Sequence, residues 1–144
     1  TIRAEGSFNA PVILKGLESQ KAELARIAAL EHSTAVEKGN ATVIEVAAEM
    51  YLRGMEFLPI DLDRSDASEF KMVDGKLLPP FNCIPALGDA VAKEIVRARD
   101  EHLFTSKEDL KKRGKVSQSI IDTMDSMGIL KNMPDEEQIS LFSF

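Results

Sequence analysis

The sequence has no tryptophan, a single tyrosine, a single cysteine and no long apolar run. One cysteine, Cys83, forms no internal disulfide and cannot by itself hold a thiolate zinc site or an iron–sulfur cluster, so we expect a reducing compartment. No stretch approaches the roughly 20 apolar residues that a membrane-spanning helix needs, and no basic, hydrophobic leader opens the chain. These absences predict a cytoplasmic protein without membrane contact.

Basic residues are outnumbered, with 18 Lys and Arg against 24 Asp and Glu and a net charge of −6. Bulk charge therefore argues against non-specific binding of polyanions, and any nucleic-acid site must be local. The 144 residues, of which 44% are hydrophobic, suffice for one compact domain or two small ones. The first residue is Thr1 rather than methionine, which leads us to expect a piece of a longer protein.

The first half of the chain predicts helices followed by short strands. We expect an extended lead-in over residues 1–15, a helix from Leu17 to a stop at Gly39-Asn40, and a second helix that ends at Gly54. Thr42 and Glu45 have the spacing of a capping box for that second helix. Short apolar runs follow over residues 55–81, where Asp74-Gly75 predicts a tight β-hairpin.

The second half predicts a helical domain. Pro79-Pro80 forbids helix and marks a boundary, after which caps and apolar spacing predict helices over residues 89–100, 106–113 and 117–127, with Gly128 as the last cap. The fold class is therefore mainly α with a short β-hairpin. The final residues add an acidic spacer and an apolar C-terminal peptide, which we expect to be flexible.

Two glycine-containing bends carry the main functional signal. Ile84-Pro85-Ala86-Leu87-Gly88, followed by a helix with Ala92 and Ile95 inward, looks like a helix-hairpin-helix motif. A glycine at such a bend permits positive φ, and the helix behind it aims free N–H groups at one point, which suits a phosphate. A weaker copy surrounds Gly114. The predicted DNA-binding residues are Ala86, Leu87, Gly88, Asp89, Lys93, Lys112, Arg113, Gly114, Lys115 and Ser117. The alternative is that both glycines are ordinary turns of a small bundle whose lysines are merely solvated.

The C-terminal peptide carries a second signal. Gln138, Ile139, Ser140, Leu141 and Phe142 place apolar side chains where chain ends are normally polar, so we expect a partner to cover them. This string resembles the sliding-clamp-binding peptide of bacterial replication proteins. The alternative is that Leu141 and Phe142 fold back onto their own domain.

Together these segments resemble the C-terminal part of the PolC-type DNA polymerase III alpha subunit of low-GC Gram-positive bacteria. The likeness includes Asp61-Leu62-Asp63-Arg64-Ser65, both bends and the tail, and it departs at Ser143-Phe144, which extend beyond the usual Leu-Phe end. The resemblance implies residues 1–55 as the end of the fingers region, 56–82 as a linker of short strands, 83–130 as a tandem helix-hairpin-helix domain and 131–144 as a clamp-binding tail.

The same resemblance implies what the chain does and what it contacts. It predicts a segment of a DNA-directed DNA polymerase that binds double-stranded primer–template DNA, the β sliding clamp and the remainder of the polymerase chain. The Mg²⁺ and the catalytic carboxylates of the parent enzyme would lie upstream, so we expect no catalytic residue, metal or cofactor in this segment. A freestanding helix-hairpin-helix module of a repair or recombination protein, and a helical partner-binding domain without a DNA role, remain open.

Two catalytic interpretations are weaker. Asp61 and Asp63, two positions apart, could share one face of a strand and bind Mg²⁺. The resemblance, however, matches them to the family's Asp-Leu-x-Arg-Ser segment, here Asp61 to Ser65, better than to a catalytic Asp-x-Asp pair. A base-excision glycosylase would need a catalytic lysine two residues after the first bend, where this chain has Ala90.

Overall fold

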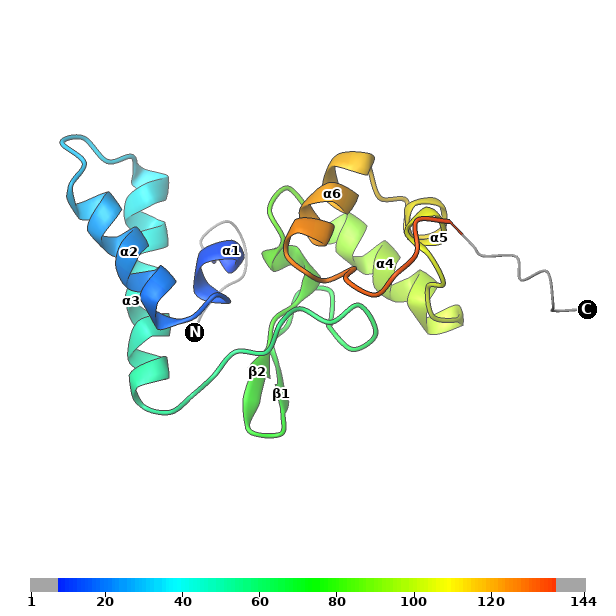
Figure 1. Ribbon diagram of the computed structural model, residues 1–144, viewed down its shortest axis with the longest axis horizontal. Helices are drawn as coiled ribbons and strands as arrows, with labels where there is room; N and C mark the ends of the chain where they lie inside the picture. The colour runs from blue at the N-terminus through cyan, green and yellow to red at the C-terminus, as the bar shows by residue number, and fades with distance from the viewer. Residues whose placement is uncertain (1–7, 137–144) are drawn as a thin grey trace, which may run out of the picture.

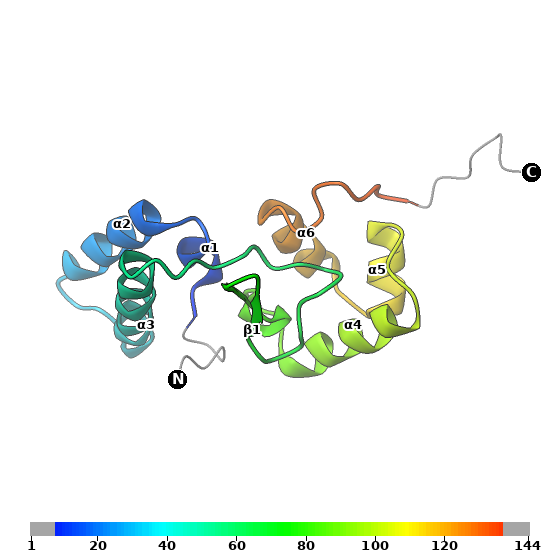
Figure 2. The ribbon, with the colours of Figure 1, turned by 90° about the horizontal axis from the view of Figure 1, so that it is seen from below.

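The computed structural model describes residues 8–136. In that part of the chain the fold is mainly helical with one two-stranded antiparallel hairpin, which confirms the predicted fold class at this level. The helices fall into two groups, with the strands between them (Figures 1 and 2). Helices α2 and α3 lie at one end of the molecule, and α4, α5 and α6 lie at the other.

The lead-in is not the extended segment that we expected, because it contains a short helix, α1, over Ala10–Ile13. The side chain of Asn9 caps it by accepting from the N–H of Val12, and Pro11 lies in its first turn, where proline is well tolerated. Helix α2, Leu17–Ala28, begins after Gly16, whose φ of 103° favours glycine.

The boundary between α2 and α3 differs from the prediction. The break falls over residues 29–34, and α3 runs over Ala35–Leu52, so Gly39-Asn40 lies inside a helix. Thr34 and Glu37 form the capping box, whereas the hydroxyl of Thr42 only donates back to the carbonyl of Lys38. The pairs Thr34 with Glu37 and Thr42 with Glu45 both have the spacing of a capping box, and in the structure the first pair forms one.

The predicted hairpin is confirmed. Strand β1, Lys71–Val73, pairs with β2, Lys76–Leu78, and Val73 lies opposite Lys76. Asp74 and Gly75 both have positive φ, 51° and 77°, as a tight turn with the twist of a hairpin requires.

The last three helices also match the prediction within a residue or two. They are α4 over Asp89–Glu101, α5 over Lys107–Arg113 and α6 over Gln118–Ser126, preceded by a single 3₁₀ turn, η1, at Phe81–Cys83. The side chains of Ser106 and Ser117 cap α5 and α6, and Gly128, with φ of 80°, follows the last turn of α6.

One connected apolar core joins the two groups of helices. Near the strands, Phe8 packs edge-on against Phe70 with ring centroids 5.3 Å apart, and against Phe57 at 5.6 Å. On the other side, the buried side chain of Arg99 on α4 donates to the carbonyl oxygens of Leu62 and Ser65. These contacts attach the linker segment to α4 and so fix the position of the bends.

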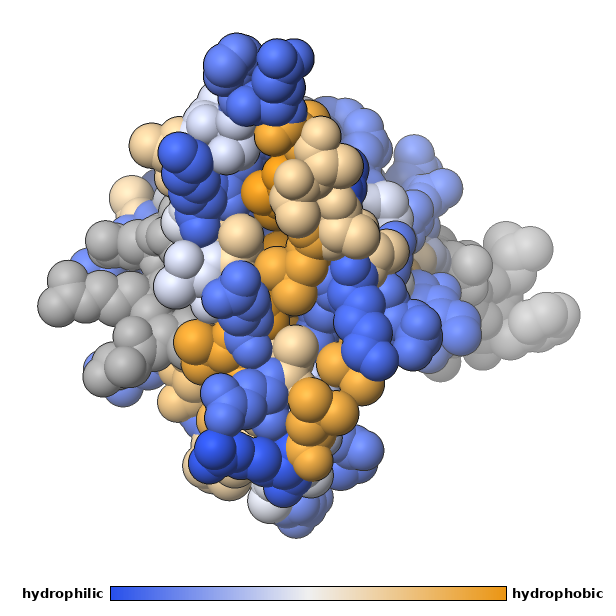
Figure 3. Space-filling view, turned by 90° about the vertical axis from the view of Figure 1, so that its left-hand side faces the viewer, coloured by the Kyte–Doolittle hydropathy of each residue, from blue (hydrophilic) through white to orange (hydrophobic). Residues whose placement is uncertain are grey.

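The end of the molecule formed by α2 and α3 carries an exposed apolar stripe (Figure 3). Large apolar side chains left exposed at this end are Leu30, in the loop between the two helices, and Val36, Val46 and Leu52 on α3. An exposed apolar band of this kind is typical of a contact surface. No helix in the described part of the chain is long and apolar enough to span a membrane.

Candidate nucleic-acid interface

The first bend connects η1 to α4. Ala86 has φ of 66°, and the buried Leu87 donates its N–H to the carbonyl of Ile84 at 3.1 Å. Gly88 is the N-cap of α4 with φ of −81°, so the positive φ expected of this glycine belongs instead to Ala86. The backbone conformation of Gly88 is one that any residue can adopt, and a Cβ at its position would meet no atom within 4 Å.

The amides of this bend are available. The first backbone bond of α4 runs from the N–H of Ala92 to the carbonyl of Gly88, and within residues 8–136 no protein acceptor engages the amides of residues 88–91. Ala86, Gly88 and Ala90 are exposed. Four unpaired N–H groups at the positive end of a helix form a site that favours an anion.

The second bend connects α5 to α6 and has the same construction. Lys115 has φ of 54°, and the buried Val116 donates its N–H to the carbonyl of Lys111 at 3.1 Å. Ser117 is the N-cap of α6, and its Oγ accepts from the N–H of Ile120 at 3.3 Å. In the described chain, the amides of residues 117–119 have no protein acceptor.

A single offset in sequence relates the main features of the two bends, although Leu87 donates three residues back and Val116 donates five residues back. It pairs the positive-φ residues Ala86 and Lys115, and the N-caps Gly88 and Ser117. The same offset pairs buried residues: Phe81 with Leu110, Leu87 with Val116, Ala92 with Ile121, and Ile95 with Met124. The bends are therefore two copies of one local structure, although their sequences share little.

This correspondence corrects the alignment suggested by the glycines, since it pairs Gly88 with Ser117 and not with Gly114. Gly114 is buried at the end of α5, and its N–H donates to the carbonyl of Leu110 at 2.9 Å. A Cβ at this position would lie 2.7 Å from that carbonyl oxygen. Gly114 is needed for close packing, and its amide is not available to a ligand.

A side-chain bridge joins the two arms of each bend. In the first, Asn82 Nδ2 donates to Asp89 Oδ1 at 3.0 Å, and in the second, Lys111 Nζ donates to Gln118 Oε1 at 3.3 Å. The same offset relates these pairs. Asn82 Oδ1 is buried without a partner in the described chain, beside a cavity of about 580 Å³ that Asn9 and Asn40 also line.

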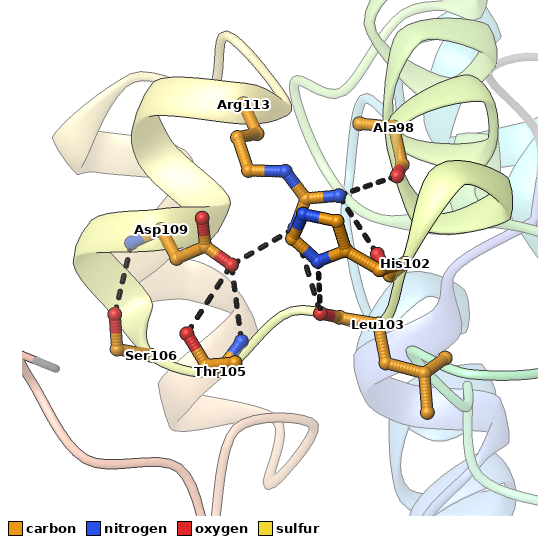
Figure 4. Close-up of polar contacts among 7 residues, drawn as sticks. All are labelled: Ala98, His102, Leu103, Thr105, Ser106, Asp109 and Arg113. Carbon is orange, nitrogen blue, oxygen red and sulfur yellow. Dashed lines mark hydrogen bonds and ion pairs between the residues drawn. The ribbon is translucent and has the colours of Figure 1, made fainter. Parts of the chain in front are cut away.

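Arg113, which we expected to contact DNA, is directed into the protein (Figure 4). Its Nη2 donates to the carbonyls of Ala98 at 2.6 Å and His102 at 2.7 Å, and its Nη1 donates to Asp109 Oδ2 at 2.9 Å. The guanidinium also stacks over the ring of Phe104 at 4.9 Å from the centroid. Arg113 therefore joins the C-terminal end of α4 to α5 and sets the angle between the two bends.

Asp109 completes this cluster. Burial alone would raise the pKa of the Asp109 carboxyl, but the N–H of Thr105 and the guanidinium of Arg113 outweigh it and hold the pKa below its ordinary value. The contribution of Asp109 to stability is complete above the pKa of an unfolded aspartate and is lost as the pH falls through its lower folded value.

Much of the positive charge around the second bend is balanced by acidic neighbours. Lys112 Nζ lies 2.8 Å from Glu108, and Arg97 on α4 contacts both Glu94 and Glu101 at 2.6 Å. Lys115 projects from the bend with its side chain 75% exposed and contacts Glu94 only at 3.7 Å. Lys93, on α4, is exposed as well. Lys93 and Lys115 are thus better placed than Arg113 to meet a phosphate.

The Asp61 to Ser65 segment is a capped turn. Asp61 Oδ1 accepts from the N–H of Asp63 at 2.8 Å, while its Oδ2 accepts from Arg64 Nε at 2.9 Å. The carboxylate of Asp61 is therefore already engaged. In the described part of the chain, no three His, Cys, Asp or Glu side chains come together as a metal site.

Sequence reasoning missed Gln118 and Ser119 in the second bend and the supporting roles of Asn82 and Lys111. The signal that would have found them is the spacing from each helix cap, an apolar residue followed by Gly or Ser and then by a buried residue four positions later. The expected clamp peptide, Gln138 to Phe142, lies outside the described residues.

Comparison with known proteins agrees with this geometry. A family model described as the helix-hairpin-helix motif matches residues 54–139. The chain is similar to proteins named DNA polymerase III PolC-type from Thermotoga maritima, with 44% identity over 142 residues, and from Listeria monocytogenes, with 48% identity over 145 residues. A relative of the same name from Bacillus subtilis is 45% identical over 143 residues.

Each of these alignments covers 99% of this chain but 10% of the relative, so the chain spans about a tenth of the length of the curated relatives it matches. The family match, in contrast, covers more than half of the chain and includes both bends. By this match, the chain belongs to the helix-hairpin-helix family.

Proposed function

We propose that this chain is the duplex-binding and clamp-tethering C-terminal portion of a PolC-type replicative DNA polymerase. The observation that carries the proposal is the repeated bend, in which a helix N-terminus presents amides that no acceptor within residues 8–136 engages. The offset that relates the two bends supports a tandem helix-hairpin-helix arrangement. The identity of 43–48% with PolC-type polymerases over nearly the whole chain supports the parent enzyme.

Each bend would bind one backbone of a double helix. The amides of residues 88–91 would face a phosphate of one strand, and those of residues 117–119 a phosphate of the other. Lys93 and Lys115 would add charge beside the first and second bend. Contacts of this kind position the protein on primer–template DNA without reading its sequence, as a polymerase requires.

The remaining predicted DNA-binding residues take different parts in this proposal. Asp89 contributes its amide, because its carboxylate is held by Asn82, and Leu87 anchors the first bend in the core. Lys112 would have to leave Glu108 to reach a phosphate. Arg113 and Gly114 would not contact DNA themselves. Arg113 would hold the second hairpin against α4, and Gly114 would allow the close packing within it.

The tail and the helical pair would make the other contacts. Residues 138–142 would bind the β sliding clamp, and the linkage of two modest contacts would raise the overall avidity for clamped DNA. The exposed apolar stripe at the α2 and α3 end would face the remainder of the polymerase chain, since this chain matches only 10% of the length of the relatives. DNA synthesis, with its Mg²⁺, would belong to the parent enzyme.

Substitutions at the N-caps test the proposal, measured as binding to a primer–template duplex. Gly88→Glu and Ser117→Glu each place a carboxylate beside an amide cluster, and each should weaken duplex binding about tenfold or more. Gly88→Ser is the matched control, because it copies the cap of the second bend and should bind like the original chain. Gly88 has ordinary φ and open space at Cβ, so Gly88→Glu and Gly88→Ser should both fold, which circular dichroism can check. Equal duplex binding by all four proteins would refute the proposal.

A further inference from the structure

The chain that leads to the C-terminal peptide returns to the second hairpin after α6. Ile129 donates its N–H to the carbonyl of Met124, Leu130 is fully buried, and Met133 donates to the carbonyl of Leu130 at 3.0 Å. The next residues, Pro134 and Asp135, lie against the start of α5. The tail therefore leaves the protein from a defined place.

The N-terminus of α5 is occupied by this returning chain. The N–H of Lys107 donates to the carbonyl of Pro134 at 2.9 Å, and that of Glu108 donates to the carbonyl of Asp135 at 3.0 Å. Ser106 takes the next two amides of the helix, one through its Oγ and one through its carbonyl. The N–H groups of residues 107–109, which a helix start would otherwise leave unpaired, are thus satisfied, in contrast to those of residues 89–91 at the start of α4 within the described chain.

The side chain of Lys107 closes the contact. Its Nζ lies 3.1 Å from Asp135 and 3.3 Å from Asp125 of α6, and only 21% of the side chain is exposed. The hydrogen bond to Asp135 raises the pKa of the Lys107 ammonium above its ordinary value. Of the basic residues from Lys107 to Lys115, only Lys107 is found bonded to both α6 and Asp135 within the described chain.

We propose that Lys107 is a positioning residue that fixes the root of the C-terminal peptide on the second hairpin, so that duplex binding and clamp binding reinforce each other. The inference rests on the proposed function, because it takes residues 138–142 as the clamp ligand. It goes further in assigning the coupling between the two sites to the junction of Lys107 with Pro134 and Asp135.

The length of the tether gives the size of the effect. From Asp135 to Gln138 the chain spans three peptide units, or at most about 11 Å at ~3.6 Å per residue. If the junction opened back to Leu130, eight units would separate the core from Gln138, or about 29 Å. Effective concentration falls roughly as the −3/2 power of tether length, so opening the junction should weaken avidity about fourfold.

Lys107→Pro tests this directly. Lys107 is the first residue of α5, where proline fits a helix, and Ser106 before it is extended, as a residue before proline prefers. The substitution removes both the N–H that holds Pro134 and the ammonium that holds Asp135. Lys131→Met, at an exposed lysine of the same segment, is the charge-matched control.

Three affinities are measured for each protein: for primer–template duplex alone, for a bacterial sliding clamp alone, and for a duplex threaded through that clamp. We expect Lys107→Pro to leave the first two unchanged and to weaken the third about fourfold, while the control changes none. Hydrogen exchange at the Glu108 amide should accelerate in Lys107→Pro, because its acceptor Asp135 is no longer held.

Unchanged affinity for the clamped duplex with both single affinities intact would overturn the inference. So would unchanged, slow exchange at Glu108, since the root would then be held without Lys107. A failure of the proposed function looks different: the double variant Leu141→Ala with Phe142→Ala would bind the clamp as well as the original chain does. In that case, hydrogen exchange at the Glu108 amide in Lys107→Pro still shows whether Lys107 holds Pro134 and Asp135 against α5.

Discussion

Replacing Arg113 by methionine should destabilise the protein and not simply weaken its binding to DNA. Methionine fills similar space beside Phe104 but removes the cation–π contact and every hydrogen bond of the guanidinium. The carbonyl of His102 then loses the donor that we find for it in the described chain, that of Ala98 keeps only the N–H of His102 at 3.4 Å, and Asp109 keeps only its bonds from Thr105. The perturbation therefore separates a structural arginine from a phosphate-binding one.

The expected magnitude follows from the burial and number of these bonds. Breaking a buried ion pair by removing one partner costs about 3–5 kcal/mol. The Arg113 side chain is still 20% exposed, so water replaces part of what is lost and we take the lower end, about 3 kcal/mol. With Asp109→Asn as the second substitution, a double-mutant cycle should give a coupling of about 1 kcal/mol.

Urea unfolding followed by circular dichroism measures these values, and duplex binding is measured below the transition. Lys112→Met is the comparison, because Lys112 also pairs with an acid on α5 but is 73% exposed, and its loss should leave the unfolding midpoint unchanged. An Arg113→Met variant that unfolds like the original chain but binds duplex poorly would refute this reasoning, and Arg113 would then be a DNA contact.

The other predictions concern packing and burial. Gly114→Ala should lower the free energy of unfolding by about 2 kcal/mol, because the new Cβ would meet the carbonyl of Leu110, whereas Gly39→Ala, in open space within α3, should raise it by about 1 kcal/mol. Thermal unfolding of both variants checks this. Burial raises the pKa of the Cys83 thiol to about 12, so a thiol reagent at pH 8 should label Cys83 only after urea unfolds the chain. Because the unfolded thiol ionises first, the stability due to this group is complete below about pH 8.5 and declines as the pH rises toward 12.

Local signals in the sequence were enough where one signal dominated. Asp74-Gly75 between two apolar runs specified the hairpin, and Ser106, Ser117 and Gly128 specified the ends of the helices around the second bend. Each of these residues acts on its own neighbours within three or four positions. Their effects therefore survive in any tertiary context that keeps the fold.

The first helical pair was mispredicted because two signals of equal kind competed. Thr34 with Glu37 and Thr42 with Glu45 have the same spacing, and Gly39-Asn40 between them suggested a stop. In the structure Ile44 and Ala47 of α3 are fully buried, and α3 packs against α2. A long α3 that begins at Thr34 provides this packing.

The sequence located the two bends, but it did not predict how they are built. Gly114 attracted attention as a glycine next to lysines, yet the bend is defined by Lys115 with positive φ and by Ser117 at the cap. A lysine with positive φ has no distinct sequence signature. The partners of Arg113 are equally hidden, because Ala98 and His102 belong to a different helix and its end, and only the tertiary structure brings them within reach.

The central claim is that the two bends hold phosphates of a duplex. Its most direct test is the affinity for primer–template duplex across a salt series, for the original chain and for Lys115→Met. The logarithm of the association constant should fall linearly with the logarithm of salt concentration, by roughly 0.9 for each phosphate neutralised, and Lys115→Met should reduce that slope by about 1. Affinity that does not depend on salt, or a slope that Lys115→Met leaves unchanged, would contradict the account.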